Sequence, residues 1–378
     1  MLAVATVQTA ELQTAEKSFW AVVDEWLKWL KEEKDKKGRT LKVYRYNMGV
    51  FKAWLDSEGI EQATRQDIKN WKQFMNAARN SKGELLSVST KNLYLTTVRN
   101  FYKWLADEYG VDNVAAGIDG WKNSKEHKRG TLNIEEMKEL INIVDPVAEQ
   151  KITNEKAKLE AVQKEAQENG RNFNFAGLIA RYEKNVRLQA LRDKAILSAL
   201  MAGGLRTIEI SRLTIADIDT VGGVCYLYVL GKGRDERESV KISRKAEKVI
   251  RAWLDAREAV DVVSDDSPLF CSVSNNSFGE ILSSLSISRL VKEYLRAAGL
   301  KEKEYKAETK KGKIKRKPIV AHSLRASMAT NAFKKGAKLD QVQQQLRHKN
   351  ITTTMIYLEE AEKECNPCSD LVSDAIFC

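Results

Sequence analysis

Apolar residues recur at helical spacing in four stretches of the first third of the chain. Val22, Trp26 and Leu30 lie one helical turn apart, and a similar spacing returns in the next three stretches. Thr64 and Asp67 have the pattern of a capping box before the third stretch. We therefore predict an all-helical unit over residues 17–120, whose aromatic residues form a core rather than a base-stacking surface. The four stripes cover residues 19–30, 44–55, 68–75 and 94–105.

Two polar segments follow this helical unit. Residues 121–131 are polar, basic and without hydrophobic periodicity, which predicts a linker. A new helix is expected at Asn133, because Glu136 follows it at capping-box spacing. Charges of both signs then repeat over about residues 147–187, which predicts a solvent-exposed helix or hairpin. We interpret this segment as an insertion in a second domain over residues 132–365.

The chain becomes core-like again from Leu191, and strand patterns follow. A β-rich run covers residues 224–230, and a second short run ends at Ile242. The basic, glycine-containing segment 231–237 lies between them, so the two runs predict a β-hairpin with a basic tip.

The rest of the second domain contains one more clear helix pattern before the motifs described below. Apolar residues at helical spacing predict a helix over residues 287–295, which Gly299 terminates. Residues 301–317 hold nine Lys or Arg and three Glu, and such a charge run is typical of a solvated loop. The fold class expected for the whole chain is mainly α with a small antiparallel β-sheet.

Composition and charge narrow the class of protein. With 378 residues, 43% hydrophobic and 30% charged, the chain is typical of a soluble globular protein of two or three domains. No apolar run approaches the roughly 20 residues that span a bilayer. No secretory signal is evident, and five scattered cysteines fit reduced thiols, so we expect a cytoplasmic protein without a membrane partner. The net charge of +11 favours a polyanionic partner, because neutralising phosphates releases counterions.

Polar residues in the second half form an ordered series. Arg206 and Glu209 lie one helical turn apart, which by itself is typical of a surface salt bridge. His322 and Arg325 are spaced to share one helical face. Two of the three histidines of the chain belong to the series, which favours chemistry over packing. In chain order the series is Arg206, Glu209, His322, Arg325, His348 and Tyr357.

The ordered series resembles the tyrosine recombinase (lambda-integrase-like) family, and most closely the Xer-like integrases of mobile elements. The resemblance covers about residues 17–365 except the insertion at 147–187, and its fragments are weak singly but specific as a set. It implies an all-helical SAM-like core-binding domain followed by an α+β catalytic domain. The matching fragments are Gly-Leu-Arg-x-x-Glu at 204–209, Gly-Lys-Gly at 231–233, His-x-Leu-Arg at 322–325, and Leu-x-His followed by Thr-Thr-x-x-Tyr at 346–357.

The resemblance also implies a function and partners. Members of this kind cut and rejoin DNA at specific sites through a 3′-phosphotyrosyl intermediate, for integration, excision or resolution of a mobile element. The implied partners are double-stranded recombination sites, a homotetramer of the chain on DNA and accessory directionality factors. No cofactor or metal is expected. Two alternatives stay open: a DNA-binding regulator without catalysis, and a type IB topoisomerase-like enzyme.

The chemistry of the residues fits phosphoryl transfer. Arg206 and Arg325 can each donate paired hydrogen bonds to the non-bridging oxygens of a phosphate and stabilise charge in the transition state. Tyr357 is the expected nucleophile, whose covalent bond to phosphorus preserves the energy needed for religation. Glu209 is expected to position Arg206 or His322.

Proton transfer requires further groups. A general acid must protonate the 5′-oxygen that leaves, and Lys232 at the hairpin tip suits this role, with Arg234 and Lys241 as alternatives. His348 is expected to donate a hydrogen bond to the phosphate. His322 is expected to assist proton transfer or to orient the phosphate.

The sequence departs from the family pattern at three positions near these motifs. Ser323 stands where an acidic residue is commoner, and Ala326 where His or Arg is commoner. Arg347 stands where Gly usually precedes the second histidine, and it could add a phosphate contact. The tail over residues 366–378 is expected to dock on a neighbouring protomer.

Overall fold

The computed structural model describes residues 17–122, 130–231, 235–274, 276–303, 306–309, 312–315 and 317–364. The chain divides into two compact units, residues 1–125 and 126–378. Each unit has a hydrophobic core of its own. No helix in the described ranges is long and apolar enough to cross a membrane.

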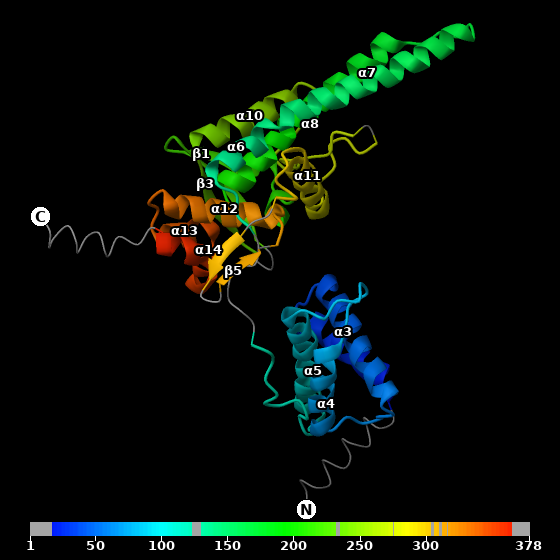
Figure 1. Ribbon diagram of the computed structural model, residues 1–378, viewed down its shortest axis with the longest axis vertical. Helices are drawn as coiled ribbons and strands as arrows, with labels where there is room; N and C mark the ends of the chain where they lie inside the picture. The colour runs from blue at the N-terminus through cyan, green and yellow to red at the C-terminus, as the bar shows by residue number, and fades with distance from the viewer. Residues whose placement is uncertain are drawn as a thin grey trace, which may run out of the picture. The chain divides into compact units, whose positions relative to one another are not determined.

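The first unit is built from four helices around an aromatic core (Figure 1). Trp26, Phe51, Trp71 and Phe101, one from each predicted stripe, are buried there. The rings of Phe51 and Trp71 pack edge to face with their centroids 4.9 Å apart, a favoured geometry for aromatic pairs. The predicted helical fold and aromatic core are therefore confirmed. The helices are α2 (Phe19–Glu32), α3 (Gly38–Ser57), α4 (Arg65–Ala77) and α5 (Val88–Tyr109).

Local signals set the ends of these helices. The side chains of Ser18, Thr64 and Ser87 each accept a hydrogen bond from a backbone N–H in the first turn of the helix that follows. The predicted capping box of Thr64 and Asp67 is present at the start of α4. Gly110 ends α5 in a left-handed conformation, with φ +68°.

The second unit contains a three-stranded antiparallel sheet in the order β1-β2-β3. Along β2 the side chains of Cys225, Leu227 and Val229 are buried and alternate with half-buried neighbours, so one face of the sheet covers the core. Gly222 and Gly223 both have positive φ in the two-residue turn between β1 and β2. Both predicted strand runs are confirmed. The strands are β1 (Ile218–Val221), β2 (Val224–Leu230) and β3 (Arg237–Ile242).

Helix α8 (Phe175–Ala202) is the central helix of this unit. Ala195, Ile196 and Leu200 are completely buried, and α7 and α10 pack against it. Because α8 is apolar on several faces only in its second half, that half alone can lie inside the core. Its neighbours are α6 (Ile134–Asn142), α7 (Val144–Glu168) and α10 (Arg244–Glu258).

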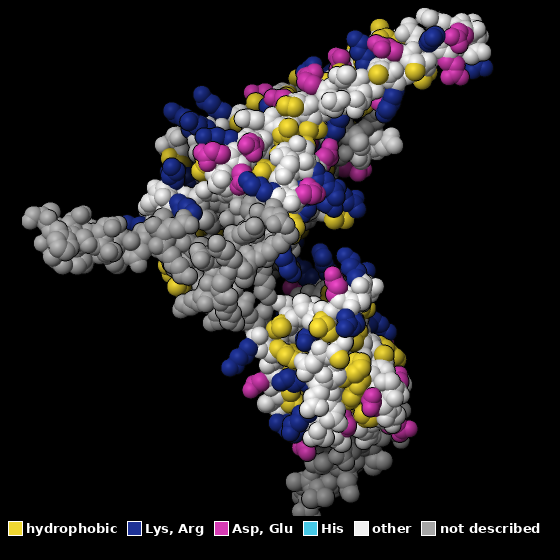
Figure 2. Space-filling model, in the orientation of Figure 1, with side chains coloured by type: hydrophobic (Ala, Val, Ile, Leu, Met, Phe, Trp, Pro, Cys, Tyr) yellow, Lys and Arg dark blue, Asp and Glu magenta, His cyan; other side chains and the backbone are white. Residues whose placement is uncertain are grey.

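Helices α7 and α8 extend together beyond the core as a two-helix arm (Figure 1). In α7 the buried side chains are those of Val144, Ala148 and Ile152, all in its first half. Figure 2 shows acidic and basic side chains interspersed along the arm. The charge-rich segment of the sequence therefore forms the solvated part of this helical pair.

The last part of the unit is helical apart from one short hairpin. The charge run at 301–317, predicted as a loop, includes strands β4 (Lys306–Thr309) and β5 (Gly312–Lys315), with Lys306 paired to Lys315. The pairing of these strands depends on backbone hydrogen bonds, which any residue type can form. A run of lysines can therefore be a strand although it lacks the apolar alternation by which a strand is predicted. The helices are α11 (Ser284–Ala297), α12 (Ala321–Lys334), α13 (Leu339–Leu346) and α14 (Ile351–Glu364).

Candidate active site

A glycine turn between α8 and α9 (Thr207–Ile210) places Arg206. Gly204 has φ +63°, a left-handed conformation that glycine adopts readily. A Cβ atom at Gly204 would overlap the Cε atom at the end of the Met328 side chain, so that side chain would have to move aside. The turn buries Leu205 and leaves the Arg206 side chain 34% exposed.

Glu209 holds Arg206 at two points. Its Oε2 accepts the backbone N–H of Arg206 at 2.7 Å, and its Oε1 accepts Nη1 of the guanidinium at 2.7 Å. Glu209 is completely buried, and burial alone would raise the pKa of its carboxyl. The charge of Arg347, the Arg206 backbone N–H, and the charges of Arg206 and Arg325 outweigh burial and lower this pKa. Glu209 is therefore an ionised partner of Arg206 at neutral pH.

Helix α12 presents His322 at the surface, next to Tyr357 of α14. The Nε2 atom of His322 lies 3.1 Å from the phenol oxygen of Tyr357. Thr330, two turns further along α12, donates its hydroxyl to the backbone carbonyl of Tyr357 at 3.1 Å. These two contacts, one from His322 and one from Thr330, hold α12 against α14 beside the Tyr357 phenol.

Arg325 points into the unit, and only 1% of it is exposed. Its guanidinium donates to the carbonyl oxygens of Gly204 and Leu346, and so ties the glycine turn to the end of α13. The Nε–H has no hydrogen-bond partner among the described residues. A buried donor of this kind is costly unless some acceptor reaches it.

His348 and Thr354 form a buried pair at the start of α14. The Nδ1 atom of His348 and the Oγ1 atom of Thr354 are 2.9 Å apart. The imidazole also lies beside the Tyr357 ring, with the ring centroids 5.8 Å apart. Because one ring nitrogen is engaged by Thr354, the other is free of that bond and can face a substrate.

The pKa values follow from burial among cations. Burial, followed by the charges of Arg325, Arg206 and Arg347, lowers the pKa of His348 to about 3, so the imidazole is neutral at pH 7. Burial raises the pKa of Tyr357, and Arg325 and Arg206 offset only part of this rise. The phenol therefore needs a proton acceptor before it can attack. Burial and the charges of Arg206 and Arg347 lower the pKa of Arg325 to about 9, which still leaves it charged at pH 7.

The expected proton donor, Lys232, and its alternative Arg234 lie outside the described residues. At the base of the hairpin, the carbonyl oxygen of Gly231 accepts Nη1 of Arg212 at 3.1 Å. Lys241, the third candidate, is exposed on β3, and its carbonyl oxygen accepts Nε2 of Gln345 at 3.0 Å. These two bonds join the hairpin to the segment after α9 and to α13.

Two residues in the site were given no defined partner by the sequence. Thr354 belongs to the Thr-Thr-x-x-Tyr fragment, but the fragment does not tell which partner its hydroxyl has. Arg347 pairs with Glu209, which lies 138 residues away in the chain. The one available signal was the position of Arg347 in place of a glycine, directly before His348.

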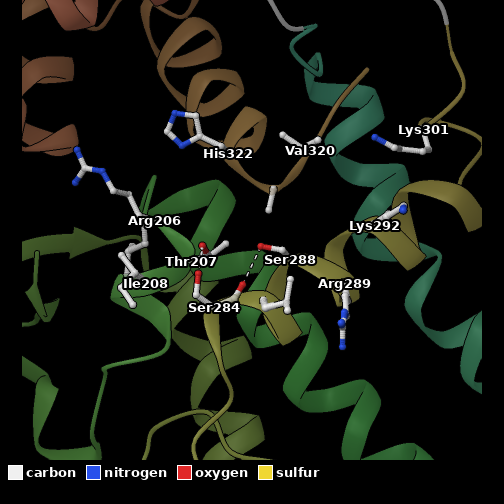
Figure 3. Close-up of a pocket in the computed structure, with 13 residues that line it drawn as sticks. Arg206, Thr207, Ile208, Ser284, Ser288, Arg289, Lys292, Lys301, Val320 and His322 are labelled. Carbon is white, nitrogen blue, oxygen red and sulfur yellow. Dashed lines mark hydrogen bonds between the residues drawn. The ribbon is translucent and has the colours of Figure 1, made fainter. Parts of the chain in front are cut away.

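A pocket of about 620 Å³ adjoins Arg206 and His322, between α9, α11 and α12. Figure 3 shows Arg206 and His322 on one side of the pocket and the cationic side chains of Arg289, Lys292 and Lys301 on the other. The nitrogen of Lys301 is held by the carbonyl oxygen of Ile319 at 2.7 Å. Cations on both sides make this pocket suited to an extended polyanion.

No group of three or more His, Cys, Asp or Glu side chains that could hold a metal ion is found within the described ranges.

Comparisons with protein families match both units. A model of the phage integrase family matches residues 171–364. A model of the SAM-like N-terminal domain of phage integrases matches residues 23–109. The first of these matches includes Arg206, His322, Arg325, His348 and Tyr357.

Curated relatives are similar over most of their length. The chain is 24% identical over 322 residues to the tyrosine recombinase XerC 2 of Ralstonia nicotianae, covering 84% of this chain and 76% of the relative. It is 25% identical over 338 residues to the tyrosine recombinase XerC of Escherichia coli, covering 89% of this chain and 90% of the relative.

Solved structures share the fold. The XerH site-specific recombinase in a post-cleavage complex with a palindromic difH substrate has a TM-score of 0.59 at 18% identity, covering 93% of this chain and 83% of that one. A lambda integrase tetramer bound to a Holliday junction has a TM-score of 0.55 at 16% identity, covering 90% and 77%. These likenesses confirm the expected fold of a helical domain followed by an α+β domain.

Proposed function

The chain belongs to the phage integrase family of tyrosine recombinases, and from this premise we propose that Tyr357 is its nucleophile. The chain is a site-specific recombinase, an enzyme that cleaves and religates DNA. One observation carries the assignment: the phenol of Tyr357 lies 3.1 Å from His322 and within the electrostatic reach of Arg206 and Arg325.

Cleavage would proceed by attack of the Tyr357 oxygen on phosphorus. A bond forms between that oxygen and phosphorus while the bond from phosphorus to the 5′-oxygen breaks, which leaves a 3′-phosphotyrosyl link. The raised pKa of Tyr357 means that its proton must be removed, and the Nε2 atom of His322 is placed to accept it. Religation reverses these steps with a 5′-hydroxyl as nucleophile.

The cations would stabilise the charge that builds on the phosphate. Arg206 has a partly exposed guanidinium, and Arg325 has a buried Nε–H that lacks a partner among the described residues. A non-bridging oxygen would satisfy such a donor. His348 is neutral, and if the Thr354 hydroxyl donates to Nδ1, the opposite nitrogen carries a proton that it can donate to the phosphate.

For the leaving group, we keep Lys232 as the proposed proton donor. A duplex with sulfur in place of the bridging 5′-oxygen would test it, because a thiolate leaves without protonation. Lys232→Ala should cleave the normal duplex slowly and the sulfur duplex at the wild-type rate. Lys241→Ala is the matched control and should cleave both at the wild-type rate. If instead Lys241→Ala cleaves the normal duplex slowly and the sulfur duplex at the wild-type rate, while Lys232→Ala cleaves both at the wild-type rate, Lys241 is the donor.

The assembly and the biological role belong to the same proposal. We infer that double-stranded recombination sites are the substrate, bound by a homotetramer, since one similar structure is a tetramer on a Holliday junction. Integration, excision or resolution of a mobile element, with accessory directionality factors, is the role that we propose. Residues 17–120 would be the core-binding domain and 132–365 the catalytic domain, with residues 366–378 docking on a neighbouring protomer.

Covalent capture tests the proposal and also identifies the DNA. A pool of nicked duplexes with a randomised centre is incubated with the protein, and duplexes that stay attached in SDS are sequenced; the sequence so recovered is called the cleavage duplex. Wild type should give adducts and Tyr357→Phe none. Adducts formed by Tyr357→Phe, or none formed by wild type, contradict the proposal. A plasmid with two copies of the cleavage duplex then distinguishes recombination from simple relaxation.

A further inference from the structure

Arg347 occupies a conformation that is unfavourable for its residue type. It ends α13 with φ +55°, in the left-handed region. Within the described residues, Asp35 is the one other non-glycine with positive φ. Glycine would fit this backbone better, so some interaction of the arginine side chain must compensate.

The Arg347 side chain is buried and paired. It is 4% exposed, and its Nη2 donates to Oε2 of Glu209 at 2.6 Å. Its Nη1 donates to the carbonyl oxygen of Gln345 at 2.9 Å. The other oxygen of Glu209 accepts the guanidinium of Arg206. A single buried carboxylate therefore joins Arg206 to the residue directly before His348.

We propose that Arg347 is a positioning residue, which orients Arg206 through Glu209 and holds α9 against the segment that carries His348 and Tyr357. This inference rests on the proposed function. With Arg347 in place, both oxygens of Glu209 are fixed, and the Arg206 guanidinium has one favoured direction. Without it, Oε2 of Glu209 keeps only the backbone N–H of Arg206, so the carboxylate is held less firmly and the Arg206 guanidinium is less well oriented.

The charges around Glu209 support this role. Arg206, Arg325 and Arg347 all face the carboxylate, and Arg347 also feels the charge of Glu238. Burial favours the neutral form of Glu209, and the charge of Arg347 opposes burial. A protonated Glu209 would attract Arg206 less strongly and would donate a proton where it now accepts.

A double-mutant cycle on single-turnover cleavage of the cleavage duplex tests the proposal. Arg347→Gly fits the backbone and removes the side chain, and it should slow cleavage about tenfold or more while DNA binding changes little. In a Glu209→Gln background the same change should have an effect of at most about twofold, since the intermediary is already lost. Arg347→Lys keeps a charge near Glu209 and should recover part of the rate.

Each alternative outcome is distinct. Equal losses in both backgrounds would overturn the proposal and would indicate that Arg347 contacts DNA by itself. Wild-type cleavage by Arg347→Gly would also overturn it, while adducts formed by the wild-type protein keep the proposed function intact. Asp35→Gly is the matched control for relief of a left-handed residue, and it should leave cleavage unchanged. If Arg347→Gly does not fold, Arg347→Lys must still show a loss that depends on Glu209.

The pH profile gives a readout that a purely structural role would not move. The charge of Arg347 holds the pKa of Glu209 down, so wild-type cleavage should not depend on this carboxyl near neutrality. In Arg347→Gly the acid limb of the cleavage rate should move to higher pH. Glu209→Gln should abolish this shift, and an unmoved acid limb in Arg347→Gly would contradict the proposed role.

Discussion

At the scale of single residues, the site concentrates charge where water is excluded. Arg325, Arg347 and Glu209 are almost completely buried, and Arg206 is partly so. Three guanidinium groups and one carboxylate leave two net positive charges, because His348 is neutral. Uncompensated buried charge is unfavourable. In the proposed reaction a phosphodiester would supply one negative charge and a second would develop as the Tyr357 oxygen bonds to phosphorus, so the two charges of the transition state would match the two net positive charges of the site.

A neutral buried His348 makes stability depend on pH. Its pKa is lowered to about 3, below the value of about 6.5 in the unfolded chain, so only the unfolded state takes up a proton between these values. Stability should therefore fall as pH drops below about 6.5. From pH 7 to pH 5 the loss attributable to His348 should be about 2 kcal/mol. Urea unfolding of wild type and His348→Gln checks this, and equal losses in both proteins would refute it.

Thr354 is expected to set which nitrogen of His348 carries the proton. If the hydroxyl donates to Nδ1, Thr354→Val removes that donor at nearly constant shape, and cleavage of the cleavage duplex should slow by about tenfold. Thr354→Ser keeps the hydroxyl and serves as the control. Single-turnover cleavage measures both variants, and equal rates for valine and wild type would exclude the role.

At the scale of elements, two short turns contribute to the site beside the helices that carry His322, Arg325 and Tyr357. Gly204 redirects the chain after α8, and its carbonyl oxygen is a partner of Arg325. Arg325 also binds the carbonyl oxygen of Leu346 at the end of α13. Two chain reversals from distant parts of the sequence are therefore fixed by a single buried side chain.

Substitutions at two glycines distinguish the stability cost of backbone strain from the cost of side-chain crowding. Gly204 and Gly222 both have positive φ, but only Gly204 has neighbours, Met328 and Leu346, where a Cβ would lie. Gly222→Ala should cost about 1 kcal/mol for the backbone alone. Gly204→Ala should cost about 1 to 2 kcal/mol more than this, because the ends of the Met328 and Leu346 side chains must move aside. Denaturant unfolding measures the cost of both substitutions, and similar costs would show that the side chains of Met328 and Leu346 move aside without penalty.

At the scale of the whole molecule, two units with separate cores carry a net charge of +11. Both units bear exposed lysines and arginines, so each can contribute phosphate contacts. Linking two binding units in one chain raises the effective concentration of the second once the first has bound.

The first unit should fold by itself. Its core, which includes Trp26 and Trp71, is made from residues of this unit alone. A fragment of residues 17–122 should show a single cooperative unfolding transition and a near-ultraviolet circular dichroism signal from its buried tryptophans. The same transition should be visible in the full chain. A fragment that binds hydrophobic dyes and melts without cooperativity would show that the core needs the second unit.

The sequence by itself determined the helical stripes of the first unit, the strand run at 224–230 and the ordered series from Arg206 to Tyr357. Hydrophobic periodicity and capping are local properties, and the family motifs were read in order along the chain. Only the tertiary structure decided the partners of Glu209, Arg325, Arg347 and Thr354, and the pairing of β4 with β5. The bonds of Glu209 and Arg325 join segments far apart in the chain, and the orientation of a guanidinium or a hydroxyl depends on what packing brings beside it.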